Sequence, residues 1–139
     1  MKIAVVGLWH LGEIYSACLA ELGHTVLGVS DDEKVIENFR KNIPPLAEPE
    51  LASLLKKHQK SGRLVYTTDF SRIKKADAIW LTLDTPVTEK DAAEVGPVFE
   101  EIKKALPHIK ENMLLVISSQ LPVGSSERIV RFVKKARPH

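Results

Sequence analysis

An apolar run that ends in a glycine turn, within residues 1–12, constrains the fold more than any other feature of this sequence. After Lys2, residues 3–6 are all apolar, and Gly7 then breaks the run. An unbroken apolar run is typical of a strand buried on both faces, as in a parallel sheet. A segment with helical spacing follows the turn, and a second apolar run occupies residues 25–29. We therefore predict a strand, a turn, a helix and a second, parallel strand.

The turn itself predicts a dinucleotide-binding unit of the Rossmann type. The usual spacing is G-x-G-x-x-G, in which the outer glycines permit the bend and the close packing of helix and strand. Gly7 and Gly12 occupy the outer positions, whereas Trp9 occupies the middle one. The free amides near His10 and Leu11 would point at an anion. Trp9 either stacks on the ligand or fills the site, and the alternative is that the glycines only shape a turn.

Acidic residues follow the second strand, where an acid usually binds the adenosine ribose. Ser30 stands at the natural position, and Asp31 follows it. Asp31 either substitutes for the ribose-binding acid or, like Asp32, caps the next helix. Acids at this place disfavour a 2′-phosphate, so NAD is predicted rather than NADP.

Polar residues after two later strands are further candidates for the cofactor groove, because ligands bind at the carboxyl ends of such strands. Thr85 follows one strand, and Ser119 and Gln120 follow another. Ordinary turn chemistry is the alternative, and for Ser118 alone it is the preferred interpretation.

The alternation of strands and helices predicts an α/β fold, a Rossmann-like, doubly wound and mostly parallel sheet with helices on both faces. Strands are predicted at residues 2–6, 25–29, 64–67, 78–83 and 113–118, and helices at 33–42, 50–57, 69–74, 98–106 and from Ser125 or Ser126. We predict that residues 1–139 form a single domain. Because such a fold commonly continues into another strand, we expect the domain to be part of a longer protein.

Composition narrows the possible partners. The formal net charge is +2 in 139 residues, with both signs interspersed, so neither nucleic acid nor a membrane surface is expected. The single cysteine, Cys18, excludes an intrachain disulfide and suits a reducing cytoplasm. The spacing of Leu11, Tyr15, Cys18, Leu19 and Leu22 places Cys18 on the apolar, buried face of the first helix. The five histidines are scattered, so no metal site is predicted.

Several motifs together resemble the NAD-binding domain of the UDP-glucose/GDP-mannose dehydrogenases. They are Met1 to Gly12, Cys18 to His24, Ile43-Pro44 with Glu48-Pro49, Thr67 to Asp69, Ala76 to Ile79 with Thr85-Pro86, and Ser119 to Gly124. The resemblance implies oxidation of a nucleotide sugar at C6 with two NAD. It also implies that Gly7, His10, Leu11 and Gly12 hold the pyrophosphate, that position 30 holds the ribose, and that Thr85 and Ser119-Gln120 lie near the nicotinamide.

The sequence departs from that family at five positions near the expected site: Trp9, Ser30, Val35, Asp84 and Gln120. We therefore expect NAD to bind more weakly than in a typical member. In the family, the catalytic residues, including a cysteine nucleophile, lie in the part of the sequence that follows this domain. We therefore assign no catalytic residue within residues 1–139. A nucleotide sugar would bind only with that C-terminal part, and an oligomer is possible. The alternative is a diverged or stand-alone Rossmann binding domain without dehydrogenase activity.

Overall fold

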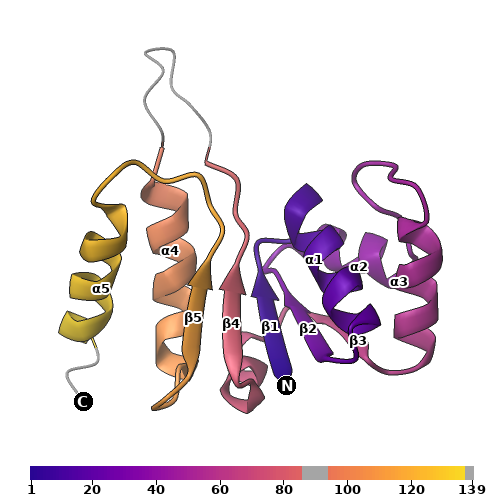
Figure 1. Ribbon diagram of the computed structural model, residues 1–139, viewed down its shortest axis with the longest axis horizontal. Coiled ribbons are helices and arrows are strands. Elements are labelled where there is room, and N and C mark those ends of the chain that lie inside the picture. Colours follow the sequence, from indigo (N-terminus) through magenta and orange to yellow (C-terminus); the bar gives the residue numbers. More distant parts are fainter. Residues whose placement is uncertain (86–93, 137–139) are drawn as a thin grey trace.

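Five parallel strands form the centre of the computed structural model, which describes residues 1–85 and 94–136 (Figure 1). The strands are β1 (Lys2–Val6), β2 (Thr25–Val29), β3 (Leu64–Thr67), β4 (Ala78–Leu81) and β5 (Leu114–Ile117). Their order in the sheet is β3-β2-β1-β4-β5, and every pair is parallel. The predicted fold class is therefore confirmed.

The connections between the strands are helical. They comprise α1 (His10–Glu21), α2 (Glu33–Arg40), α3 (Leu51–Lys60), α4 (Gly96–Ala105), α5 (Ser125–Ala136) and the 3-10 helices η1 (Phe70–Lys75) and η2 (Leu106–His108). The strand predicted through residue 83 ends at Leu81, because its partner β1 ends opposite Leu81 and turns away at Gly7. Pro86, in one of the family-like motifs, lies outside the described residues.

Alternating side chains of each strand supply two separate cores, one on each face of the sheet. Ile3 and Val5 of β1 pack in a cluster with residues of α1, α2 and α3. Ala4 and Val6 point to the other face and join a cluster with residues of η1, α4 and α5. Two covered faces explain why the strands read as continuous apolar runs rather than as alternating ones.

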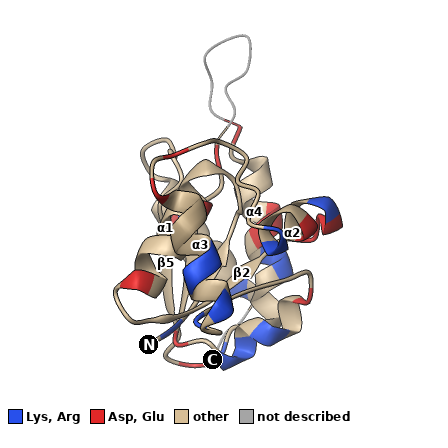
Figure 2. Ribbon diagram, turned by 90° about the vertical axis from the view of Figure 1, so that its right-hand side faces the viewer, with Lys and Arg blue, Asp and Glu red and all other residues tan. Residues whose placement is uncertain are grey.

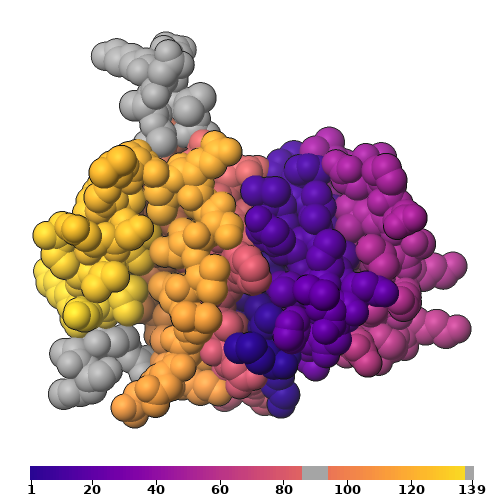
Figure 3. All heavy atoms as spheres, in the orientation of Figure 1, coloured from indigo at the N-terminus to yellow at the C-terminus, as the bar shows by residue number. Residues whose placement is uncertain are grey.

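The sheet ends at β5 on one side. Leu114, the first residue of this strand, is 57% exposed. The space-filling view shows the β5 segment, in orange, at the surface of the molecule (Figure 3). Within the described ranges, no helix combines the length and the apolar composition needed to span a membrane.

Aspartates begin two of the helices. The Asp32 carboxylate accepts the amides of Lys34 at 2.8 Å and Val35 at 3.3 Å, so Asp32, rather than Asp31, caps α2. Asp69 caps η1 by accepting the Ser71 amide at 2.9 Å, and hydrogen bonds from the Ser71 side chain and then from this amide lower the pKa of Asp69. Both caps supply acceptors for amides that a helix start leaves without partners.

The buried face of α1 differs from the predicted one. Cys18 is exposed and Leu22 is 75% exposed, so the prediction of a buried Cys18 was wrong. The residues that α1 buries are mainly small: Gly12, Ser16, Ala17 and Ala20, with Glu13 and Leu19. The helix begins so close to the end of β1 that small residues face the sheet, and large apolar side chains are displaced to its flanks.

One of these buried residues is a carboxylate without a partner. Glu13 is fully buried, and neither of its carboxylate oxygens meets a hydrogen-bond partner among the described residues. The Tyr66 hydroxyl is likewise buried without a partner, and the Glu13 charge acts on it. Burial raises the pKa of Glu13 to about 7, because the charged form loses its hydration.

We expect the Glu13→Gln variant to remove a pH dependence of stability. With an ordinary pKa of 4.5 in the unfolded chain, Glu13 makes the folded state bind more protons between pH 4.5 and about 7. Stability is therefore highest below this window and falls by about 3 kcal/mol as the pH rises through it. Urea unfolding at pH 5 and pH 8 measures this difference, which should shrink in Glu13→Gln.

The control for this experiment is Glu111→Gln, because Glu111 is exposed. Its unfolding free energy should change with pH as in the wild type. An equal pH dependence of wild type and Glu13→Gln would contradict the burial cost assigned to Glu13.

Candidate functional site

The turn between β1 and α1 requires its two glycines. Gly7 has φ +98°, in the left-handed region, and a Cβ atom there would lie 2.7 Å from the Leu83 amide nitrogen. A Cβ atom on Gly12 would lie only 2.1 Å from the Gly7 carbonyl oxygen. No real side chain tolerates either distance, so α1 can begin directly against the turn only with glycine at both positions.

Thr82, which follows β4, holds the same turn from the other side. Its fully buried hydroxyl donates to the Gly7 carbonyl at 2.8 Å and lies 3.2 Å from the Val6 carbonyl. The Thr82 amide also donates to the Val6 carbonyl at 2.9 Å. This role of Thr82 was not predicted from the sequence. Its only signal was its place at the carboxyl end of a strand that neighbours β1.

The start of α1 presents unpaired amides. The amides of His10, Leu11 and Gly12 find no acceptor among the described residues, whereas the next amide, of Glu13, donates to the Trp9 carbonyl at 3.0 Å. Trp9 occupies the position before the helix, makes no side-chain cap and is 50% exposed. Three open amides at the positive end of a helix dipole attract an anion.

His10 lies between this helix start and the loop before α3. Its Nε2 atom is 3.4 Å from a carboxylate oxygen of Glu48. Its Nδ1 atom is buried and has no partner among the described residues. The imidazole therefore carries one buried polar atom without a described partner next to the turn.

Two adjoining cavities lie beside the turn and share Leu83 and Asp84. One has a volume of about 410 Å³ and is lined by Gly7, Leu8, Trp9, Leu83 and Asp84. The other, of about 190 Å³, is lined by Leu11, Leu83, Asp84, Thr85, Ser118 and Gln120. The structure thus brings the predicted Gly7, Trp9, Leu11, Thr85 and Gln120 together. Leu83 and Asp84 lie just after Thr82 at the carboxyl end of β4, and this place in the sequence marks them as lining residues.

The ends of β4 and β5 are tied together by hydrogen bonds. The Thr85 hydroxyl donates to the Gln120 carbonyl at 2.6 Å. Trp80 Nε1 donates to Ser118 Oγ at 2.7 Å, so the Ser118 hydroxyl forms a bond to the neighbouring strand β4 rather than a local turn contact. The Ser119 hydroxyl oxygen is buried without a partner among the described residues, and Ser119 lines neither cavity.

The segment after β2 lies outside both cavities. Ser30 Oγ accepts the Asp32 amide at 3.2 Å, which uses the hydroxyl within the loop. The Asp31 carboxylate pairs with Lys104 of α4 at 2.6 Å, and Lys104 also reaches Glu101 at 2.5 Å. This long-range pair was not predicted, because Lys104 is 73 residues away in the sequence.

The residues present fit a dinucleotide through their backbone and two orphaned polar atoms. The open amides of α1, Nδ1 of His10 and Oγ of Ser119 all lack partners among the described residues. No group of three or more His, Cys, Asp or Glu in residues 1–85 and 94–136 is placed to hold a metal ion. Parallel order, glycine turn and open helix start define a dinucleotide-binding domain of the Rossmann type.

Comparison with known proteins makes the assignment more specific. The family model of the UDP-glucose/GDP-mannose dehydrogenase NAD-binding domain matches residues 1–139. UDP-glucose 6-dehydrogenase of Rickettsia conorii is 33% identical over 96% of this chain and 31% of its own length. UDP-glucose 6-dehydrogenase YwqF of Bacillus subtilis is 31% identical over 93% of this chain and 30% of its own length.

Solved structures agree with these relatives. GDP-mannose dehydrogenase from Pseudomonas aeruginosa, in a ternary complex, superposes with a TM-score of 0.91 at 25% identity, over 100% of this chain and 33% of that one. A UDP-glucose dehydrogenase from Pyrobaculum islandicum superposes with a TM-score of 0.88 at 26% identity, over 97% of this chain and 32% of that one. The chain belongs to the UDP-glucose/GDP-mannose dehydrogenase family and corresponds to its NAD-binding domain. It spans about a third of the length of these relatives.

Proposed function

We propose that NAD binds across the carboxyl ends of β1, β2, β4 and β5. The observation that carries this proposal is the row of open amides at the start of α1, directly above the glycine turn and beside two cavities. The pyrophosphate is assigned to Gly7, His10, Leu11 and Gly12, with Trp9 beside it. The adenosine ribose is assigned to Ser30 and Asp31, and the nicotinamide end to Thr85, Ser119 and Gln120.

Side chains at this site oppose the binding that the backbone favours. The Asp84 carboxylate lines both cavities and repels a pyrophosphate. Trp9 lines one of the cavities, at the position where the family pattern has a glycine. Ser30 has no charge to offer the ribose, and a lost charge-assisted hydrogen bond costs about 1.5–3 kcal/mol, roughly tenfold or more in affinity.

The double variant Trp9→Gly/Ser30→Asp should bind NAD at least about tenfold more tightly than the wild type. The glycine clears the approach to the pyrophosphate, and the aspartate supplies the charged ribose contact. Titration calorimetry measures both affinities. Ser61→Asp, at the end of α3, adds the same charge elsewhere and should leave the affinity unchanged. Equal affinities of wild type and double variant would contradict the roles given to Trp9 and Ser30.

We further propose that the whole protein oxidises a nucleotide sugar, such as a UDP- or GDP-hexose, at a CH–OH carbon. This reaction would take place in the cytoplasm and would supply polysaccharide biosynthesis. NAD, when bound, accepts the hydride. Residues 1–139 form the single domain that binds and orients the cofactor. A further part of the protein would bind the sugar and supply the catalytic residues. Family membership and the open amides favour this function over a stand-alone binding domain.

The 139-residue chain alone should produce no NADH from UDP- or GDP-sugars. Hydride transfer needs the sugar held against the nicotinamide, and the family's route to the acid needs a cysteine nucleophile. Cys18 is exposed on α1 and lines neither cavity. The ultraviolet absorbance of NADH is the measurement. Turnover that Gly12→Ala abolishes would show that these residues assemble a complete active site.

A further inference from the structure

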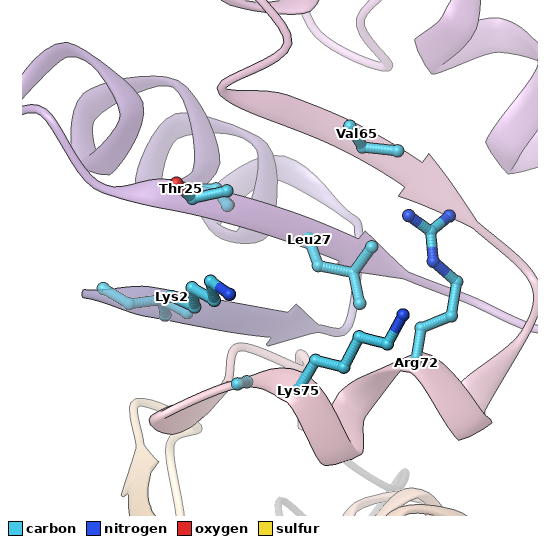
Figure 4. Close-up of a pocket in the computed structure, with 9 residues that line it drawn as sticks. Lys2, Thr25, Leu27, Val65, Arg72 and Lys75 are labelled. Atoms are coloured by element: carbon cyan, nitrogen blue, oxygen red, sulfur yellow. The ribbon is translucent and has the colours of Figure 1, made fainter.

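A further cavity lies toward the opposite ends of the strands from the candidate cofactor site. It has a volume of about 180 Å³ and lies where the amino-terminal parts of β1, β2 and β3 meet η1. Leu27, Val65 and Ala76 supply apolar surface, and Lys2, Arg72 and Lys75 are its cationic residues (Figure 4). We call it the basic groove.

The apolar surface of the basic groove follows from the topology. Helices α1, α2 and α3 pack on one face of β2 and β3, through Val26, Leu64 and Tyr66. Leu27 and Val65 point to the other face, where the short η1 crosses the sheet, and both remain partly exposed. Two aliphatic side chains are therefore left accessible on a rigid sheet surface.

The cations of the groove come from two elements that are distant in sequence. Figure 4 shows Lys75 and Arg72 extending from η1 toward Leu27 and Val65, with Lys2 on the neighbouring strand. All three side chains are exposed, and none forms a salt bridge with a described residue, unlike Lys41, Lys57, Lys103, Lys104 and Lys110. The groove is therefore cationic, and its three charged side chains are not neutralised by a salt bridge with any described residue.

Two carboxylates interact with these cations through their charge, but both already accept hydrogen bonds from other groups. Asp77 accepts the backbone amide of Lys2 at 2.8 Å and lies 3.9 Å from Lys110. Asp69 caps η1 through the Ser71 amide. Hydrogen bonds lower the pKa of both carboxyl groups, chiefly from the Ser71 side chain at Asp69 and from the Lys2 amide at Asp77, so both stay charged. An added anion would relieve the repulsion among the three cations.

We propose that the basic groove binds a small organic anion with a compact apolar body. Its carboxylate or phosphate group contacts Arg72 and Lys75, with Lys2 at the other end of the groove, and its apolar body rests on Leu27, Val65 and Ala76. A dry cavity of about 150 Å³ holds a benzene ring, so the volume of about 180 Å³ suits a body of one ring or a short branched chain. The guanidinium of Arg72 suits the planar, two-oxygen geometry of such a headgroup.

This site is separate from the proposed NAD site. None of the residues lining the two cavities at the turn lines the basic groove. Figure 2 shows several Lys and Arg positions in the half of the molecule that carries the N-terminus. Binding of the anion therefore does not depend on NAD, and either proposal can fail without the other.

Amide-resolved NMR titration of the ¹⁵N-labelled chain tests the proposal with four probes: benzoate, phenyl phosphate, benzyl alcohol and acetate. Benzoate or phenyl phosphate should cause saturable shifts at Leu27, Val65 and Ala76, with Kd on the order of 1 mM for a ligand of this size. The tighter of the two identifies the headgroup. Benzyl alcohol lacks the charge and acetate lacks the apolar body, so both should bind at least about tenfold more weakly.

Two variants distinguish the effect of the cations in the groove on anion binding from the effect of positive charge elsewhere on η1. Arg72→Gln/Lys75→Gln should weaken benzoate or phenyl phosphate binding at least about tenfold. Lys74→Gln, on the same helix but outside the groove, should bind as the wild type does. The double variant should keep its NAD affinity. No saturable shift at tenfold above the expected Kd, or equal binding of benzoate and benzyl alcohol, would overturn the proposal.

Discussion

The contact between the first turn of α1 and the end of β1 determines the geometry of the whole carboxyl edge of the sheet. Gly12 lies so close to the Gly7 carbonyl that a single added carbon would force the two segments apart. The Thr82 hydroxyl fixes the same carbonyl and so ties β4 to the turn. Because of this contact, the open amides of α1 stand beside Leu83 and Asp84, and the two cavities adjoin.

Much of the fold was predictable because the ends of the apolar runs mark the ends of the strands. The runs at 2–6, 25–29 and 64–67 match β1, β2 and β3, since both faces of the sheet are covered and each strand is apolar along its length. The buried face of α1 was not predictable from large apolar residues. Close packing selects Gly12, Ser16, Ala17 and Ala20, and so leaves Cys18 exposed. A stripe of small residues carries a weaker periodic signal than leucines do.

The site was predictable only where one local segment forms it. The turn from Gly7 to Gly12 could be found because strand, bend and helix follow one another in sequence. Thr82, Leu83 and Asp84 join the site through the register of β4 against β1, which pairs Val6 with Leu81. The contact of Asp31 with Lys104 depends on the packing of α4 against the loop after β2. Local spacing encodes neither relation. The sequence placed Asp84 near the site only through the family resemblance, and it indicated neither the role of Thr82 nor the pair of Asp31 and Lys104.

Backbone and side chains act in opposite directions at this edge. The backbone keeps what a pyrophosphate needs, namely free amides and room at two glycines. Trp9 and Asp84 add bulk and negative charge at the same place. An NAD-binding domain built this way depends on its helix start for affinity, so the binding should be weak but correctly located.

The location of NAD is therefore the most direct test, and amide-resolved NMR titration of the chain with NAD measures it. We expect shifts to concentrate at Gly7 to Gly12, around Ser30 and at Leu83 to Thr85, because those amides surround the turn and its neighbouring strand ends. Shifts concentrated instead at Thr25, Val65 and Lys75, in the basic groove, or no shifts at saturating NAD, would contradict a cofactor site at the start of α1.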